Sequence, residues 1–253
     1  MMTALFSLTG QRALVTGASR GLGQAIAVAL AAAGAELICT SSAVGGCQET
    51  VQKIIAGGGK ATALAADLSD EKVVEKLAAD ALATGQIDIL VNCGGTIFRA
   101  PAHQFPMQEW HKVIAVNLDA AFLLSQRIGA AMIARKQGKI INIASMLSYS
   151  GGITVPAYTA SKHAIAGVTK ALANEWAQHN IQVNAIAPGY FRTDNTAALQ
   201  ADTERNAAIT ARIPAARWGE PEDLAGAAVF LASRASDYVN GHLLAVDGGW
   251  LAR

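Results

Sequence analysis

Short apolar runs alternate with helical segments along the whole chain, and this alternation limits the folds that the chain can adopt. Seven runs predict strands, at residues 12–16, 36–40, 62–66, 87–92, 139–145, 182–188 and 242–249. The main helices are predicted between them, at residues 24–34, 48–56, 71–84, 107–136, 156–179 and 221–233. Strands that alternate with helices form a parallel sheet, and continuous apolar strands are typical of a sheet covered on both faces. We therefore predict an α/β protein with a doubly wound parallel sheet of about seven strands.

The composition fits a single domain that spans residues 1–253. No linker rich in Pro, Gly or Ser divides the chain, and a chain of this length buries roughly 70–75% of its unfolded surface. The charged fraction is 15% and the net charge is +1, so neither nucleic acid nor an anionic membrane is an expected partner. Cys39, Cys47 and Cys93 show no metal-site spacing and are predicted to be reduced, and the histidines suggest no metal site either.

The sequence also predicts a cytoplasmic protein. Its first residues lack the basic start and the apolar run of a signal peptide. No uninterrupted apolar run approaches about 18 residues, the length that a membrane-spanning helix needs. The low charged fraction suggests that other subunits cover some of the apolar surface.

A glycine-rich turn joins the first predicted strand to the first helix. Gly17, Gly21 and Gly23 let the backbone turn tightly and approach a pyrophosphate, and the helix N-terminus behind them favours negative charge. The spacing is Gly-x-x-x-Gly-x-Gly rather than the commoner Gly-x-Gly-x-x-Gly. A tight turn without a ligand is the alternative, but the position after the first strand favours a dinucleotide site.

A second motif lies at residues 145–162. Tyr158 and Lys162 are four residues apart and project from one face of the predicted helix, and Ser145 ends the strand before it. An unperturbed tyrosine has a pKa of about 10. One cation about 4 Å away, at an effective dielectric constant near 20, stabilises a phenolate by about 4 kcal/mol, or roughly three pKa units. The motif therefore predicts a tyrosine that exchanges protons near neutral pH.

Taken together, the motifs resemble those of the short-chain dehydrogenase/reductase family. They are, in order, residues 16–23, Asp67, residues 92–95, Asn117, Ser145, Tyr158-x-x-x-Lys162 and Pro188-Gly189. The resemblance runs from about Phe6 to Arg253 and implies a single-domain Rossmann fold. One departure is Asn92-Cys93-Gly94-Gly95, where the family usually has Asn-Asn-Ala-Gly.

The resemblance implies a role for each of four polar residues. Tyr158 is the expected general acid/base, and Ser145 is expected to hold the reacting oxygen. Lys162 is expected to lower the pKa of Tyr158 and to bind the nicotinamide ribose. Asn117 is expected to hold a water that links Lys162 to solvent, and asparagine is otherwise a poor choice inside a helix.

The implied cofactor is NAD or NADP, and the sequence leaves the choice open. A carboxylate at the end of the second strand would favour NAD, but Ser41 and Ser42 stand there. Arg20 could pair with the 2′-phosphate of NADP. Together with Tyr158 and Lys162, the expected cofactor contacts are Gly17, Ser19, Arg20, Gly21, Leu22, Gly23, Ser41, Asp67, Leu68, Asn92, Gly94, Pro188, Gly189 and Thr193.

The second half of the chain is similar to the sugar-acid branch of the family, whose enzymes interconvert a keto-deoxy sugar acid and its diketo form. Such a substrate needs a cation for its carboxylate. Arg99 is the first candidate, and Arg192 and Arg217 are alternatives. The expected substrate contacts are Arg99, Ser145, Met146 and Tyr158, and Tyr149 and Trp250 could also shape the pocket.

Three alternatives stay open. Two are a dehydrogenase of gluconate and a reductase of 3-oxoacyl groups on an acidic carrier protein, although the net charge of +1 argues against the carrier. The third is a non-catalytic cofactor sensor, which would be expected to lose its catalytic residues. The family resemblance implies a homotetramer in which helices 107–136 and 156–179 pack between subunits, with the final strand and the C-terminal tail in another contact.

Overall fold

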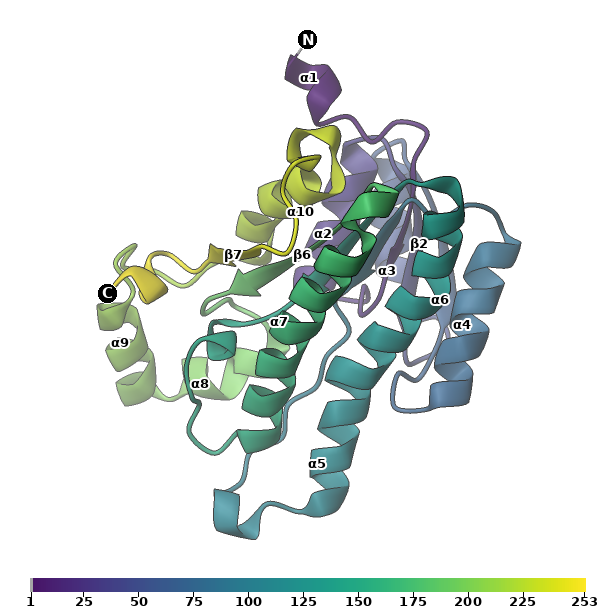
Figure 1. The fold of residues 1–253 in the computed structure, drawn as a ribbon. Helices are drawn as coiled ribbons and strands as arrows, with labels where there is room; N and C mark the ends of the chain where they lie inside the picture. The colour runs from purple at the N-terminus through teal and green to yellow at the C-terminus, as the bar shows by residue number, and fades with distance from the viewer. Residues whose placement is uncertain (1) are drawn as a thin grey trace.

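The computed structural model describes residues 2–253, with side chains from Ala4 onward. Seven parallel strands form one sheet in the order β3-β2-β1-β4-β5-β6-β7 (Figure 1). The strands are β1 (Arg12–Val15), β2 (Glu36–Ser41), β3 (Lys60–Ala65), β4 (Ile89–Asn92), β5 (Gly138–Ile143), β6 (Ile181–Pro188) and β7 (Leu243–Val246). The predicted doubly wound parallel sheet is confirmed.

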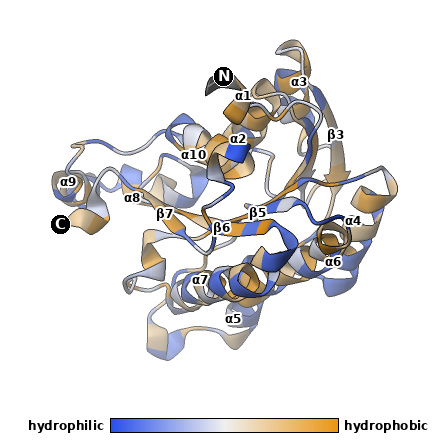
Figure 2. Ribbon diagram, turned by 45° about the horizontal axis from the view of Figure 1, so that its top comes forward, coloured by the Kyte–Doolittle hydropathy of each residue, from blue (hydrophilic) through white to orange (hydrophobic). Residues whose placement is uncertain are grey.

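Helices cover both faces of the sheet (Figure 2). One face carries α2 (Gly21–Ala32), α3 (Gln48–Ala56) and α10 (Ala225–Ala232). The other carries α4 (Glu71–Ala83), α6 (Ala120–Arg135) and α7 (Pro156–Trp176). The other α-helices within residues 2–253 are α1 (Met2–Leu5), α5 (Met107–Ile114), α8 (Ala197–Ala201) and α9 (Thr203–Arg212).

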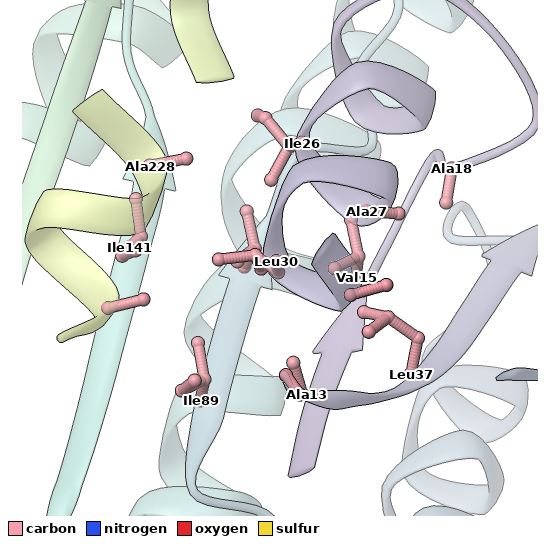
Figure 3. Packing of buried hydrophobic residues seen from close by; sticks show 14 of the residues in the cluster. Ala13, Val15, Ala18, Ile26, Ala27, Leu30, Leu37, Ile89, Ile141 and Ala228 are labelled. Atoms are coloured by element: carbon pink, nitrogen blue, oxygen red, sulfur yellow. The ribbon is translucent and has the colours of Figure 1, made fainter. Parts of the chain in front are cut away.

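Apolar packing holds α2 directly over β1 (Figure 3). Ile26 and Leu30 of α2 are fully buried in one cluster with Ala13 and Val15 of β1. Burying a side chain of the size of isoleucine or leucine contributes about 1.5–3 kcal/mol. This packing fixes the start of α2 relative to the end of β1, and therefore positions the glycine-rich turn between them.

The strand order reverses at β1. The chain runs from β1 outward to β3, then crosses to β4 and continues to β7. In open parallel sheets a ligand crevice lies at such a reversal, beyond the carboxyl ends of the strands. Residues 16–23 after β1 and residues 93–95 after β4 border this crevice.

Strand β3 differs from the prediction that every strand is covered on both faces. Lys60, Thr62, Ala63 and Ala65 are exposed, because β3 is the edge strand and pairs with β2 alone. Its short alanine side chains offer little surface for a helix to cover. A lysine at the start of an edge strand also discourages pairing with a further chain.

The predicted helix 107–136 is divided. Residues Ala115–Asp119 form a π-helical turn between α5 and α6. Such turns insert one residue into a helix and are frequent at functional sites. By length and composition the helical run Met107–Arg135 could cross a membrane, whereas the sequence analysis predicted no membrane-spanning helix. However, Leu124, Ile128 and Met132 of this run are buried in the core against the sheet.

The segment between β6 and α10 is more ordered than the sequence indicates. It begins with a 3₁₀ turn, Asp194–Thr196, and continues into α8 and α9. The Asp202 carboxylate caps α9 by accepting a hydrogen bond from Arg205 N at 2.9 Å. Figure 1 shows α8 and α9 near the C-terminus, beyond the end of β7.

Candidate active site

Glycines allow the turn after β1 to pack against the turn after β4. Gly17 has a φ of +64°, and a Cβ there would lie 2.8 Å from Gly94 Cα. A Cβ on Gly23 would lie 2.2 Å from the Gly17 carbonyl oxygen. Thr16 Oγ1 accepts hydrogen bonds from Cys93 N at 3.0 Å and Gly94 N at 2.9 Å. Even a methyl group is therefore too large at these glycines.

The glycine-rich turn leaves backbone donors available to an anion. α2 begins at Gly21, and its N-cap residue Arg20 makes no side-chain capping bond. The first N–H groups of a helix lack intrahelical partners and carry the positive end of its dipole. The Cβ position of Gly21 lies 3.5 Å from Thr193 Cγ2, so Thr193 forms the facing wall. This arrangement fits the pyrophosphate of a dinucleotide.

Other residues predicted to contact the cofactor lie in or beside the same turn. The Ser19 carbonyl accepts a hydrogen bond from Gln24 Nε2 at 3.2 Å, and Leu22 packs on the core cluster beneath α2. The Arg20 side chain reaches across the crevice, with Nε 2.7 Å from Asp194 Oδ2. Ser41, at the end of β2, donates a hydrogen bond to the Ala43 carbonyl at 3.0 Å.

Asp67 and Leu68 follow β3, at the same edge of the sheet as the glycine-rich turn. Asp67 Oδ1 accepts hydrogen bonds from Ser69 N at 2.9 Å and Ser69 Oγ at 2.8 Å, which hold the Asp67 pKa below its usual range. The N-cap of α4 is Asp70, so Asp67 is not needed as the helix cap. A Cβ on Gly94 would lie 2.3 Å from Leu68 Cδ1, so Leu68 packs over Gly94.

The Asn92 side chain does not face the crevice, contrary to its predicted cofactor contact. It is buried, and Nδ2 donates to Asn142 Oδ1 at 2.8 Å, Ser125 Oγ at 3.1 Å and the Ala121 carbonyl at 3.3 Å. These bonds join the end of β4 to β5 and α6. The side chain therefore supports the sheet.

Ser145, Tyr158 and Lys162 come together at the end of β5. Ser145 follows β5, and its Oγ accepts a hydrogen bond from Leu147 N at 3.1 Å. Tyr158 and Lys162 lie on α7, and Lys162 Nζ is 5.5 Å from the centroid of the Tyr158 ring. Lys162 is buried, and Nζ donates to the Ile143 carbonyl at 2.6 Å. The structure thus brings the predicted serine, tyrosine and lysine into one group.

Lys162 is not among the groups that set the direction of the Tyr158 pKa in this structure, so its predicted lowering of that pKa stays a prediction. Burial raises the Tyr158 pKa above its usual value, and the opposing contributions come from a hydrogen bond with Ser145 and the charge of Arg99. Burial also lowers the pKa of Lys162 to about 8. The ammonium lies beside the tyrosine ring and donates a hydrogen bond to the Ile143 carbonyl.

Asn117 lies within the π-helical turn, and its side chain is already bonded. Oδ1 accepts from Thr96 N at 2.8 Å, and Nδ2 donates to the Thr96 carbonyl at 2.9 Å and to Ser161 Oγ at 3.1 Å. Both amide hydrogens are therefore used. The side chain fastens the loop after β4 to α7, and the water relay to Lys162 stays a prediction.

Arg99 is better placed for a substrate carboxylate than the two alternatives. Its charge lowers the pKa of Tyr158, and Nη2 donates to the Asn195 carbonyl at 3.2 Å. Arg192 pairs with Glu220 at 3.0 Å, and Arg217 pairs with Asp223 at 2.6 Å. Within residues 4–253, no carboxylate forms a salt bridge with Arg99.

Of the predicted pocket residues, two lie together and one points elsewhere. Met146 and Trp250 are buried in one apolar cluster with Ile209 of α9 and Trp218. Tyr149 does not join them, because its hydroxyl donates to the Leu243 carbonyl on β7 at 3.1 Å. Met146 and Trp250 therefore support the base of α9.

Pro188 is the last residue of β6, and Gly189 and Thr193 follow the strand, as predicted. A Cβ on Gly189 would lie 2.6 Å from Asp247 Cα, so only glycine fits between β6 and β7. Thr193 N-caps the 3₁₀ turn Asp194–Thr196 in a reciprocal capping box with Thr196. These residues form the crevice wall that faces the glycine-rich turn.

Two residues near the site were not singled out by the sequence. Asp194 and Asn195 bind Arg20 and Arg99, and only their place after Thr193 could have signalled this. The sequence also did not indicate the setting of the Cys93 thiol, whose burial raises its pKa to about 12 and so keeps it protonated. Among the described side chains, no group of three or more His, Cys, Asp or Glu could hold a metal ion.

Comparison with known proteins identifies the family to which this fold belongs. A family model described as enoyl-(acyl carrier protein) reductase matches residues 17–251. The chain is 56% identical over 248 residues to 2-dehydro-3-deoxy-D-gluconate 5-dehydrogenase of Bacillus subtilis, and the match covers 98% of this chain and 97% of the relative.

Two solved structures are similar over nearly their whole length. A candidate NAD(P)-dependent gluconate 5-dehydrogenase from Beutenbergia cavernae, with NADP bound at low occupancy, has a TM-score of 0.96 and 53% identity and covers 98% of this chain and 100% of its own. A candidate 2-deoxy-D-gluconate 3-dehydrogenase from Agrobacterium tumefaciens, with NADP bound, has a TM-score of 0.94 and 54% identity and covers 98% of this chain and 99% of its own. More than half of the residues are identical to those of these relatives over almost the whole chain, and the fold is the same. This protein therefore belongs to the short-chain dehydrogenase/reductase family.

Proposed function

We propose that this protein transfers a hydride between NAD or NADP and a secondary alcohol or ketone of a sugar acid. The observation that carries the proposal is the group formed by Ser145, Tyr158 and Lys162 at the end of β5, with the charge of Arg99 acting on Tyr158. The activity that we propose is that of 2-dehydro-3-deoxy-D-gluconate 5-dehydrogenase, which is the name of the Bacillus subtilis relative that is 56% identical to this chain.

The residues of the site divide the proton chemistry among them. A bound nicotinamide dinucleotide would accept or supply the hydride. During reduction the Tyr158 phenol donates its proton to the ketone oxygen, and during oxidation the Tyr158 phenolate takes the proton of the substrate hydroxyl. Ser145 holds the reacting oxygen and stabilises the Tyr158 phenolate. Lys162 keeps a positive charge beside the Tyr158 ring and, with a pKa of about 8, is mostly protonated at neutral pH.

The binding of a dinucleotide is supported by the glycine-rich turn and by the first N–H groups of α2, which have no partner within the helix. The end of β2 carries Ser41 rather than a carboxylate, so a 2′-phosphate would meet no fixed negative charge there. NAD and NADP both remain compatible with this end of the crevice.

The substrate is assigned by a panel of sugar acids assayed with NAD and with NADP, following absorbance of the reduced nicotinamide. We expect the highest kcat/KM with 2-dehydro-3-deoxy-D-gluconate. A higher value for gluconate or its 5-keto form would favour the gluconate dehydrogenase alternative, which the Beutenbergia structure represents. Turnover of a 3-oxoacyl thioester alone would overturn the sugar-acid proposal.

Replacing Arg99 by alanine is expected to raise KM for sugar acids by about 10- to 100-fold, because a hydrogen bond to a charged group contributes about 1.5–3 kcal/mol. The effect on kcat should be smaller, since the carboxylate is bound equally before and during reaction. The measurement is steady-state kinetics at saturating dinucleotide. Arg217→Ala is the matched control, because Arg217 is held by Asp223, and an unchanged KM in Arg99→Ala would remove Arg99 from this role.

We also propose that the protein is a cytoplasmic homotetramer. Apolar side chains of the helical run Met107–Arg135 remain exposed, including Met107 and Phe122, and this surface would pack between subunits. Size-exclusion chromatography with light scattering is expected to give a mass of about four 26.1 kDa chains. A monomeric mass would contradict the tetramer without affecting the proposed chemistry.

A further inference from the structure

An exposed ion pair joins the glycine-rich turn to the segment that follows β6. Arg20 Nε lies 2.7 Å from Asp194 Oδ2, and the two side chains are 75% and 71% exposed. Arg20 is the N-cap residue of α2, whereas Asp194 begins the 3₁₀ turn after β6. The pair therefore links two segments that lie 174 residues apart in sequence (194 − 20) on opposite walls of the crevice.

The backbone of Arg20 lies on the side of the crevice where β2 ends. Ala18 N donates to the Thr40 carbonyl at 2.9 Å, which fastens the turn to the last residues of β2. Thr50 Oγ1, on α3, donates to the Ala18 carbonyl at 2.6 Å. A carboxylate in the Ser41 position would hold the adenosine ribose, and this chain has none there. Arg20 is the cation of the glycine-rich turn, which is hydrogen-bonded to the end of β2 through Ala18. The Arg20 side chain points instead towards Asp194.

The segment that Asp194 begins is also held from the substrate side. Arg99 Nη2 donates to the carbonyl of Asn195, the residue next to Asp194. The same segment continues into α8 and α9, and Ile209 of α9 packs with Trp218 and Trp250. Asp194 is therefore held in position by its own segment, whereas Arg20 ends in a long, exposed side chain that can change partner.

We propose that Asp194 sets the preference between NAD and NADP by competing with the adenosine 2′-phosphate for Arg20. This inference rests on the proposed dinucleotide function. With NAD the Arg20–Asp194 pair stays closed, because NAD offers no second phosphate at the ribose. With NADP the phosphate provides an alternative anionic partner with three acceptor oxygens, which suits the guanidinium fork.

The exchange is energetically feasible because the pair is solvent-exposed. Exposed ion pairs contribute only about 0.2–1 kcal/mol, so a phosphate can displace the carboxylate. The same small energy limits how far Asp194 can shift the preference. Removing its charge is expected to change the ratio of the two dissociation constants by about 2- to 5-fold.

The test measures binding of oxidised NAD and NADP separately by isothermal titration calorimetry, without substrate. We expect Asp194→Asn to raise the ratio Kd(NAD)/Kd(NADP) by about 2- to 5-fold. Arg20→Gln is expected to weaken NADP binding by about 10-fold or more, the scale of a charge-assisted hydrogen bond. In the Arg20→Gln variant, Asp194→Asn should leave the ratio unchanged, because the guanidinium for which Asp194 and the 2′-phosphate compete is then missing.

A second exposed pair on the same wall is the matched control. Glu220→Gln breaks the pair with Arg192, which does not involve the glycine-rich turn, and should leave the ratio unchanged. An unchanged ratio in Asp194→Asn, or the same increase with and without Arg20, would overturn the competition. If the wild-type protein bound neither dinucleotide, the proposed function itself would fail, and the two failures are therefore distinguishable.

Discussion

Replacing Tyr158 by phenylalanine is expected to abolish measurable turnover while dinucleotide binding persists. The substitution removes only the hydroxyl that is proposed to exchange the proton with the substrate. General acid–base catalysis contributes about 10²- to 10⁴-fold to a rate. Phenylalanine fills nearly the same volume, so the packing of α7 against the sheet should be retained. Steady-state kinetics, with binding measured separately by calorimetry, checks both halves of the expectation.

The control for Tyr158 lies in the same stretch of sequence. Tyr149 donates its hydroxyl to the Leu243 carbonyl and is half-exposed, so Tyr149→Phe should retain turnover within a few-fold. Thermal unfolding of both variants shows whether either substitution damages the fold. Activity of Tyr158→Phe close to that of the wild type would refute the proposed mechanism.

Replacing Gly23 by alanine is expected to disrupt dinucleotide binding. The new Cβ would lie 2.2 Å from the Gly17 carbonyl oxygen and 3.2 Å from Ala18 Cα, and these contacts are backbone atoms that cannot rotate away. Overpacking of this kind costs about 1–3 kcal/mol, equivalent to about 5- to 150-fold in an equilibrium constant. If the turn moves to relieve the overlap, Kd for the dinucleotide rises; if it cannot move, Tm falls.

Gly226→Ala provides the comparison for Gly23. Gly226 lies on α10, and a Cβ there would meet no atom within 4 Å. Alanine in a helix is favoured over glycine by about 0.5–1 kcal/mol, so this variant should be as stable as the wild type or more stable. If Gly23→Ala changed neither Kd nor Tm, the close packing of the two turns would not be required for binding.

The alternation of apolar strands with helices was sufficient to predict the sheet. All seven strands and the presence of helices on both faces follow from local patterns that span about 5 to 20 residues, whereas the face that each helix covers depends on the strand order. The edge strand β3 was predicted less well, because its exposure depends on which strand ends the sheet rather than on its own residues. The π-helical turn at Ala115–Asp119 was missed for a related reason, since one inserted residue hardly changes a helical pattern.

The site shows the same division between local and distant information. Tyr158 and Lys162 could be paired from the sequence because a helix brings residues four apart onto one face. The direction of the Tyr158 pKa could not, because it depends on how the tertiary structure buries the ring and brings Ser145 and Arg99 towards it. The inward-facing Asn92 amide likewise depends on its contacts with β5 and α6.

By itself, the sequence determined the fold and the family and indicated a candidate catalytic group, because each depends on short-range periodicity or on motifs of fixed spacing. The tertiary structure decided which of three arginines is free to meet a carboxylate, how the crevice walls are joined, and that Asp194 is the partner of Arg20. These features join residues roughly 100 to 170 positions apart, or depend on which charges are already paired. Charge attraction acts through space, so chain order alone does not reveal its partners.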